Sequence, residues 1–288
     1  MSMDIAKKPC VPQVGADIEG FILDIDAGDA VPCVGLIKGT KEEPHPIAGL
    51  PKGFALQEDN VMVEYNIPPA KNYKAFTNNI QAARSAVTDA LYALNGSYVL
   101  NVSPDMLFKK DQLTSKQAQL IGCDVDYDAY QGGAVRRAPA TPLNNWRSAG
   151  GHVHLGGDFQ CPDFVAALFC DLSIGIAGGT VGLQSTRRAA WYGQPGVFRP
   201  KPYGIEYRTP DAAWTGSRTT VQKVGAYAIN LAKWLTDNDA RTIQTTFRRI
   251  DWAEVRRLCT FDPNVTNTLR KKERSALLTE ARRAGAPV

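Results

Sequence analysis

Four short segments alternate apolar residues with pairs of ionisable or amide side chains. They are GADIEGFIL (15–23), NVMVEYNIPP (60–69), GGHVHLGG (150–157) and GIEYRT (204–209). Because residues i and i+2 of a β-strand point to the same face, each segment is predicted to be a strand with one apolar and one polar face. This pattern constrains the chain to a sheet whose polar face is assembled from several strands.

The residues that share each polar face are of unusual types. The pairs are Asp17 with Glu19, Glu64 with Asn66, His152 with His154, and Glu206 with Arg208. An antiparallel sheet with one solvated face alternates in the same way. However, acidic residues are depleted in strands, and glycine flanks three of the segments, which suits close approach of a ligand or another backbone. We therefore interpret the set as a functional surface.

If these strands are neighbours, the merged face gathers Asp17, Glu19, Glu64, Glu206 and a histidine. Carboxylates at short range raise one another's pKa unless a counter-charge is present. A divalent cation supplies that charge, and oxygen-rich ligation with a small imidazole share favours Mg²⁺, with Mn²⁺ as an alternative, over zinc. The pattern thus predicts a magnesium site, and protein-bound Mg²⁺ commonly works with phosphate groups.

A cationic stretch precedes and includes the last of these segments. It contains Arg187, Arg188, Arg199, Lys201 and Arg208. Arginine binds phosphate and carboxylate in a two-pronged fashion, although a solvated run of charges explains the stretch equally well. Beside a carboxylate–metal cluster it would suit phosphoryl transfer. The sequence has no phosphate-binding loop of the G-x-x-x-x-G-K-[ST] type and no G-x-G-x-x-G fingerprint.

The remaining pattern predicts an α+β fold. Residues 73–95 carry apolar side chains at helical spacing, residues 161–184 look helical with Pro162 near the first turn, and the chain is helical from residue 217 onward. The apolar positions of the first helix are Phe76, Ile80, Ala83, Val87, Leu91 and Leu94. We expect one catalytic domain over residues 1–288, with a mostly antiparallel sheet in 14–215, helices on its outer face, and a helical part in 216–288.

Composition excludes several other classes of protein. A net charge of +4 is too small to argue for a nucleic-acid partner. There is no apolar run long enough for a membrane span and no hydrophobic leader segment, so a cytoplasmic protein is expected. The six cysteines are scattered without a C-x-x-C pair, which favours reduced thiols over disulfides or a zinc knuckle.

The order G-x-D-x-E, E-x-N-x-P-P, G-G-H-x-H and E-Y-R resembles the glutamine synthetase and glutamate–cysteine ligase superfamily. Within it, the stretches DNVMVEYNIPPA, GGHVHLGG and RPKPYGIEYRTP are similar to the phage-encoded carboxylate–amine ligases of type 2. The motifs span residues 15–214. The resemblance implies a curved, mostly antiparallel sheet with the site on its concave face.

The resemblance also implies roles for individual residues. The implied metal ligands are Asp17, Glu19, Glu64, His152 and Glu206. Asp17 departs from the family, which more usually has Glu there, and His152 ranks above His154 as a ligand. Arg208 would stabilise the transferred phosphate, with Arg188 and Arg199 as further phosphate or carboxylate contacts. Arg208, Arg199, His154 and Asn66 are assigned to the ATP-binding face.

The predicted function is ATP-dependent joining of a carboxylate to an amine through an acyl phosphate. The predicted cofactors are ATP and Mg²⁺, the substrates are small molecules or peptides, and a phage-encoded enzyme would act in the host cytoplasm, where it could form a homo-oligomer. Alternatives are a phosphotransferase on the same fold, a metal-dependent hydrolase, and a non-catalytic binding or virion-associated protein. We further expect Gly151 and Gly156 to let the strand run close to the nucleotide.

Overall fold

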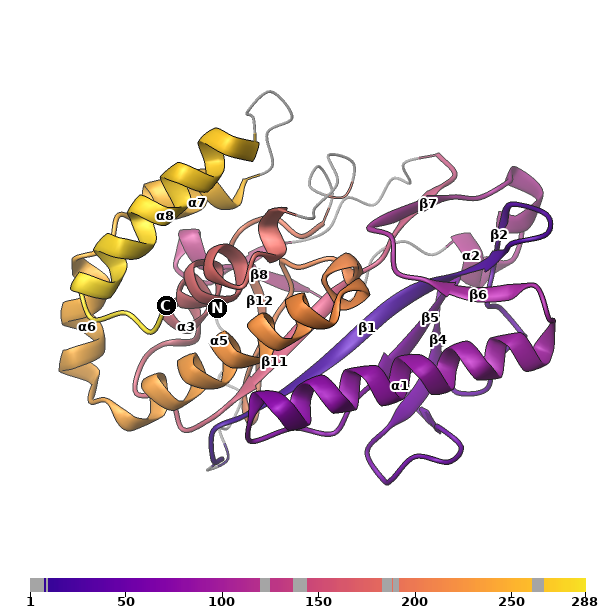
Figure 1. Cartoon of the computed structure of the whole chain (residues 1–288), viewed down its shortest axis with the longest axis horizontal. Helices are drawn as coiled ribbons and strands as arrows, with labels where there is room; N and C mark the ends of the chain where they lie inside the picture. The colour runs from indigo at the N-terminus through magenta and orange to yellow at the C-terminus, as the bar shows by residue number, and fades with distance from the viewer. Residues whose placement is uncertain are drawn as a thin grey trace.

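The chain folds around an eleven-stranded sheet in which every described pair of strands is antiparallel (Figure 1). The computed structural model describes residues 8, 10–119, 125–136, 144–182, 188, 192–260 and 267–288. The strands of the main path lie in the order β3 (His45–Pro46), β4 (Ala55–Asp59), β5 (Met62–Asn66), β1 (Gln13–Asp24), β11 (Gly151–Gly156), β13 (Gly204–Tyr207), β12 (Val197–Lys201), β8 (Asp126–Asp128) and β9 (Ala134–Arg136). The predicted α+β class with a large antiparallel sheet is confirmed.

The long strand β1 joins the two halves of the sheet. Its first half pairs with β5 on one side and β11 on the other, and its last residues pair with β2 (Asp29–Val31) and β6 (Tyr98–Asn101). Strands β7 (Asp105–Leu107) and β10 (Trp146–Ser148) form a separate two-stranded sheet. The four ionisable strands predicted from sequence are therefore consecutive neighbours in the order β5, β1, β11 and β13.

Apart from the short α2 near β2, the helices cover one face of the sheet or collect at one end of the molecule (Figure 1). They are α1 (Tyr73–Leu94), α2 (Lys116–Gln119), α3 (Asp163–Cys170), α5 (Arg218–Asp237), α6 (Ala240–Arg248), α7 (Trp252–Cys259) and α8 (Asn267–Arg283). Helices α1 and α5 run side by side across the strands, while α6, α7 and α8 lie near α3 (Figure 1). The expected helical C-terminal part is confirmed, and no helix among the described residues is long and apolar enough to cross a bilayer.

Helix α1 forms where the apolar spacing predicted it. Asn72 caps its first turn by accepting a hydrogen bond from the Ala75 backbone at 2.9 Å. Five of the six predicted apolar positions, from Phe76 to Leu91, are buried against the sheet and α5. The sixth, Leu94, is 53% exposed because the helix ends there, beyond the covered face.

The helix predicted over residues 161–184 changes its winding part of the way along. Pro162 is the N-cap of α3, and after Cys170 the chain continues as a π-helical segment, Asp171–Ala177, followed by a 3-10 turn, Thr180–Gly182. Residues 183–187, which include the end of this prediction and Arg187, lie outside the described residues, as does Cys123. None of the other five cysteines forms a disulfide within the described part of the chain.

Close packing of α1 on α5 depends on Gly225. The glycine is buried in α5, and a Cβ atom placed there would lie 2.7 Å from the Phe76 ring. The same ring stacks on Trp214 with the two centroids 6.1 Å apart. Glycine is unfavourable in a helix interior by about 1 kcal/mol relative to alanine, so we infer that its small volume is what this position requires.

We expect Gly225→Ala to lower the melting temperature even though alanine is the better helix former. The added methyl group must displace the Phe76 ring, and overpacking typically costs about 1–3 kcal/mol. Thermal unfolding followed by circular dichroism measures the change. Phe76→Leu, introduced into the Gly225→Ala variant, should recover part of the loss; a simple rise in stability of the single variant would contradict this account.

Candidate active site

The polar face of the sheet lies opposite the helices and brings together side chains from seven strands. Directly paired residues of antiparallel strands point to the same side, and the register pairs Asp17 with Asn66 and His152, Glu19 with Glu64, His154 with Glu206, and Glu206 with Arg199. The face carries Asp59, Glu64, Asn66, Asp17, Glu19, His152, His154, Glu206, Arg208, Arg199, Lys201 and Asp126. All ten residues predicted for the site are close to this face, with Arg188 at its margin.

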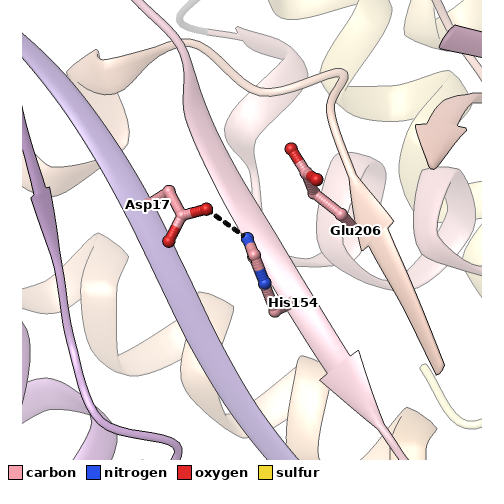
Figure 2. Close-up of side chains that lie close together, drawn as sticks. All are labelled: Asp17, His154 and Glu206. Atoms are coloured by element: carbon pink, nitrogen blue, oxygen red, sulfur yellow. Dashed lines mark ion pairs between the residues drawn. The ribbon is translucent and has the colours of Figure 1, made fainter. Parts of the chain in front are cut away.

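One cluster at the centre consists of Asp17, His154 and Glu206, one from each of three adjacent strands (Figure 2). Nε2 of His154 lies 2.8 Å from a carboxylate oxygen of Asp17, and Nδ1 contacts the hydroxyl of Tyr203. Burial lowers the pKa of His154, but the neighbouring Asp17 carboxylate outweighs this effect, so the pKa of His154 is raised. Ligand atoms of the three residues lie within 4.8 Å of one another, close enough to share one cation.

A small cavity adjoins this first cluster. Its volume is about 150 Å³, and its lining includes Gln13, Asp17, Ile67, Pro69, His154 and Tyr203. Carboxylate and imidazole therefore meet a mostly apolar recess at the end of the face where β1 begins. The recess gives a small group direct access to two members of the cluster.

A second cluster consists of Glu19, Asp59 and Glu64, whose ligand atoms also lie within 4.8 Å of one another. Burial, together with the charge of Asp59, raises the pKa of Glu19 to about 7. Burial and the neighbouring carboxylates raise the pKa of Glu64 well above its usual value. Arg188 and Arg208 only partly offset these effects on Glu19. A bound cation would relieve the remaining repulsion between the carboxylates.

Asp59 was missed in the sequence. It ends β4 and lies on the same face as Gln57, which pairs with Glu64 across the hairpin. The sequence feature that could have revealed it is Asn60, which forms the turn between β4 and β5 in the left-handed backbone conformation, with φ 57°. Recognising that turn would have fixed the hairpin register and placed a carboxylate beside Glu64.

His152, the histidine ranked first from sequence, has a different environment from His154. Its Nδ1 atom accepts from Nη1 of Arg208 at 3.1 Å and lies 3.5 Å from Glu206. Burial, reinforced by Arg208, holds the pKa of His152 well below its usual range, so the ring is neutral. Of the two histidines, His154 and not His152 belongs to a cluster that could hold a cation. The sequence had ranked His152 first as a metal ligand.

Cations occupy the other half of the face. Arg208 and Arg199 both reach Asp126, at 2.9 and 3.0 Å, and Lys201 lies 2.7 Å from Glu206. Arg208 also contacts Glu206 directly. Burial alone would raise the pKa of Glu206, but Arg208 and the other nearby cations hold it well below its usual value.

Arg188 is buried behind these groups and is engaged with the backbone. It donates to Oγ of Ser148 at 3.0 Å and to the carbonyl of Pro210 at 3.2 Å. Burial lowers its pKa, and the charges of Asp211 and Glu19 partly offset this effect. The structure therefore places Arg188 within electrostatic reach of Glu19 while its guanidinium supports the chain around β10 and Arg208.

The glycines of GGHVHLGG leave room for the protein itself. A Cβ on Gly150 would lie 2.3 Å from Nε2 of His152, and one on Gly151 would lie 2.4 Å from the carbonyl of Asp211. A Cβ on Gly156 would approach Gln13 at 3.0 Å. The expectation that Gly151 leaves space for a nucleotide is therefore wrong, because Asp211 already fills that space. Gly156 lines the small cavity beside the first cluster, so the expectation for it stays a prediction.

A family comparison now adds to this geometry. The model of the phage phiEco32-like COOH.NH2 ligase-type 2 family matches residues 89–256, more than half of the chain. The chain belongs to this family of carboxylate–amine ligases. The matched range contains His152, His154, Glu206 and Arg208, whereas Asp17 and Glu64 precede it.

Two further comparisons give little. No protein with a curated description matches the sequence. The crystal structure of a bifunctional glutathione synthetase from Pasteurella multocida superposes with a TM-score of 0.44 at 12% identity, covering 94% of this chain and 45% of that one. The chain therefore spans less than half the length of that protein, and the likeness is too distant to transfer a fold or an activity.

The buried Asp211 generates a test of the electrostatics at the margin of the site. Burial raises its pKa to about 7, with Arg188 opposing the shift. Because the folded state then holds a proton that the unfolded state releases between about pH 4 and pH 7, stability should rise as pH falls through this range. Asp211→Asn removes that proton, so the free energy of unfolding of the wild type, relative to the variant, should increase by about 2–3 kcal/mol between pH 7.5 and 5.

Urea unfolding at the two pH values measures this difference. The control is Asp239→Asn, at an exposed helix cap where the Thr242 backbone lowers the pKa. That carboxyl titrates below pH 5, so its removal should leave the pH dependence in this window unchanged. Equal pH dependence of the wild type and Asp211→Asn would contradict the assignment.

Proposed function

We propose that this ligase is ATP-dependent and activates its carboxylate substrate as an acyl phosphate. The observation that carries the proposal is the division of one sheet face into two halves. Glu19, Asp59 and Glu64 form a carboxylate half, and Arg199 and Arg208 belong to a cationic half, with the Asp17–His154–Glu206 cluster between them. Cation sites beside guanidinium groups suit the binding of a nucleoside triphosphate.

The proposed reaction has two steps. A carboxylate oxygen of the substrate attacks the γ-phosphorus of ATP, the bond to the β-phosphate oxygen breaks, and ADP leaves. The amine nitrogen then attacks the acyl carbon, phosphate leaves, and the nitrogen loses a proton to give the amide. In this scheme Arg208 and Arg199 neutralise charge on the transferred phosphoryl group, with Arg188 as a supporting cation, and the enzyme contributes positioning and electrostatics.

The residues present fit a divalent cation such as Mg²⁺ or Mn²⁺. Both clusters are dominated by oxygen donors. Glu19 and Glu64 have raised pKa values because they are buried among like charges. In addition, the buried Oδ1 of Asn66, next to Asp17, accepts no hydrogen bond from the described residues. Asp17, His154 and Glu206 would hold one cation, and Glu19, Asp59 and Glu64 another. Such cations would supply positive charge that offsets the charge of phosphate groups.

The proposal extends to the architecture around the site. The sheet corresponds to the glutamine synthetase-like catalytic fold, with the polar face as its concave side. Residues 14–215 carry the site and residues 216–288 support it within one catalytic domain, because α5 packs on β1 and β11. The substrates are a small-molecule or peptide carboxylate and an amine, and the enzyme acts in the cytoplasm.

Amide formation should depend on the carboxylates of the polar face. Glu19→Gln and Glu206→Gln keep the side-chain volume but remove the charge, and each should reduce ATP-dependent amide formation by about 100-fold or more. Mass spectrometry of the wild-type enzyme with ATP, Mg²⁺ and mixed carboxylates and amines identifies the substrates, and coupled release of ADP and phosphate gives the rate. Glu58→Gln is the matched control, since Glu58 adjoins Asp59 in β4 but faces away and binds the Gly35 backbone.

Full activity of Glu19→Gln or Glu206→Gln would refute the site assignment. A stable phosphorylated product without amide would instead indicate a phosphotransferase. Turnover without nucleotide would indicate a metal-dependent hydrolase. A wild-type protein that does not bind Mg-ATP in calorimetry would indicate a binding or virion-associated protein.

Cation binding distinguishes the two histidines. His154→Gln removes a member of the central cluster, so we expect it to weaken Mn²⁺ binding by about tenfold or more. His152→Gln should have a smaller effect, because the Nδ1 atom of His152 is already engaged by Arg208. Electron paramagnetic resonance of free Mn²⁺ in a titration measures both affinities. A larger loss in His152→Gln would restore the order predicted from the family.

A further inference from the structure

A buried carboxylate lies on the helix side of the sheet, behind the cationic half of the site. Asp171 is the first residue of the π-helical segment and is fully buried. Its carboxylate accepts hydrogen bonds from the hydroxyls of Tyr207 at 2.6 Å and Tyr130 at 2.9 Å, and from the backbone N–H of Gly196. π-Helical segments are rare and often occur at functional sites.

The three donors lie in or beside three adjoining strands. Tyr207 is in β13, Gly196 directly precedes β12, and Tyr130 is in the turn Ala129–Gln131 that follows β8. On the opposite face these strands carry the cationic half of the site: Glu206 from β13 with Arg208 directly after it, Arg199 and Lys201 from β12, and Asp126 from β8. One carboxylate is therefore bonded to Tyr207 within β13 and to residues that directly adjoin β12 and follow β8.

Packing leaves this junction little freedom. Gly196 has φ +74°, and a Cβ atom there would lie 2.8 Å from the Tyr130 ring. A Cβ on Gly175 would lie 3.3 Å from the Tyr207 hydroxyl. The Arg256 guanidinium lies over the Tyr130 ring, 5.0 Å from its centroid. The tyrosine hydroxyls are thus held at fixed positions relative to the π-helical segment.

Tyr207 connects the junction to the site most directly. Tyr207 lies between Glu206 and Arg208 in the sequence. Because side chains alternate along the strand, the Tyr207 side chain points to the helices, and those of Glu206 and Arg208 point to the polar face. Any displacement of the Tyr207 ring moves the backbone that carries both neighbours. The contacts of Arg208 with Asp126 and His152 join β13 to β8 and β11, so they depend on this placement.

We propose that Asp171 is a positioning residue for phosphoryl transfer, which aligns β8, β12 and β13 so that Arg199 and Arg208 meet the transferred group. This inference rests on the proposed ATP-dependent reaction. Asp171 touches neither substrate nor nucleotide and acts only through the strands. Because the guanidinium groups act on charge that develops during transfer, loss of alignment should reduce kcat more than it raises KM for the carboxylate substrate.

Two variants loosen the junction without changing its volume greatly. Asp171→Asn replaces one acceptor oxygen by an amide NH₂ that faces hydroxyl and N–H donors, and Tyr207→Phe removes a single donor. Ser173→Ala is the matched control. Ser173 is buried in the same π-helical segment, but within the described ranges its hydroxyl bonds only to the carbonyl of Pro287, at 3.4 Å, away from the three strands.

We expect Asp171→Asn and Tyr207→Phe to lower kcat by about 10- to 100-fold with less than about a threefold change in KM for the carboxylate substrate. Ser173→Ala should keep kcat within about twofold, whatever its melting temperature. Wild-type kcat in Asp171→Asn and Tyr207→Phe would overturn the proposal. So would a loss of kcat that follows melting temperature equally in all three variants, since that is the signature of a merely structural role.

Crystal structures of the wild type and Tyr207→Phe separate this proposal from the proposed function. If the wild type forms no amide with ATP, the proposed function fails, and the alignment is then judged from the structures alone. Displacement of Arg208 from Asp126 in Tyr207→Phe, with Arg188 still bonded to Ser148, supports the alignment by Asp171. An unchanged contact between Arg208 and Asp126 overturns it.

Discussion

The register of β1 between β5 and β11 is the constraint on which the site depends. Because side chains alternate with a period of two, a slip of one residue would turn Asp17 and Glu19 toward the helices. Burial of Val14 and Ile18 on the helix side opposes such a slip, since both are fully buried. The hydrophobic core therefore fixes which carboxylates meet, and the carboxylates themselves need contribute nothing to stability.

Carboxylates on this one face have opposite electrostatic environments. Glu206 lies among Arg208, His154 and Lys201, which hold its pKa well below the usual value, whereas burial among acids raises the pKa of Glu64. A bound cation would relieve the second environment, and an anionic group would find partners beside the first. Their proximity across β1 and β11 is a physical reason to place a phosphate chain along the face.

Much of the fold and part of the site can be predicted from the sequence because they follow from local periodicity. Strand alternation identified the polar face, and helical spacing identified α1. Asp59 and Asp126 could not be found in this way, since each belongs to a short strand whose role depends on hairpin register or distant pairing. The order of the histidines also depended on tertiary contacts, because only the folded chain shows that Arg208 engages His152 and Asp17 engages His154.

The same alternation gives different roles to three consecutive residues at the end of β13. Glu206 and Arg208 face the site, while Tyr207 between them faces the helices and bonds to Asp171. A strand that carried only the site residues would be held by its ladder of backbone hydrogen bonds, which fixes register but permits twisting and sliding of the sheet. A hydrogen bond from the strand to a second layer removes part of that freedom. The polar core behind the sheet thus bears on the geometry of the site in front of it, because preorganised charges act best when they do not have to reorganise.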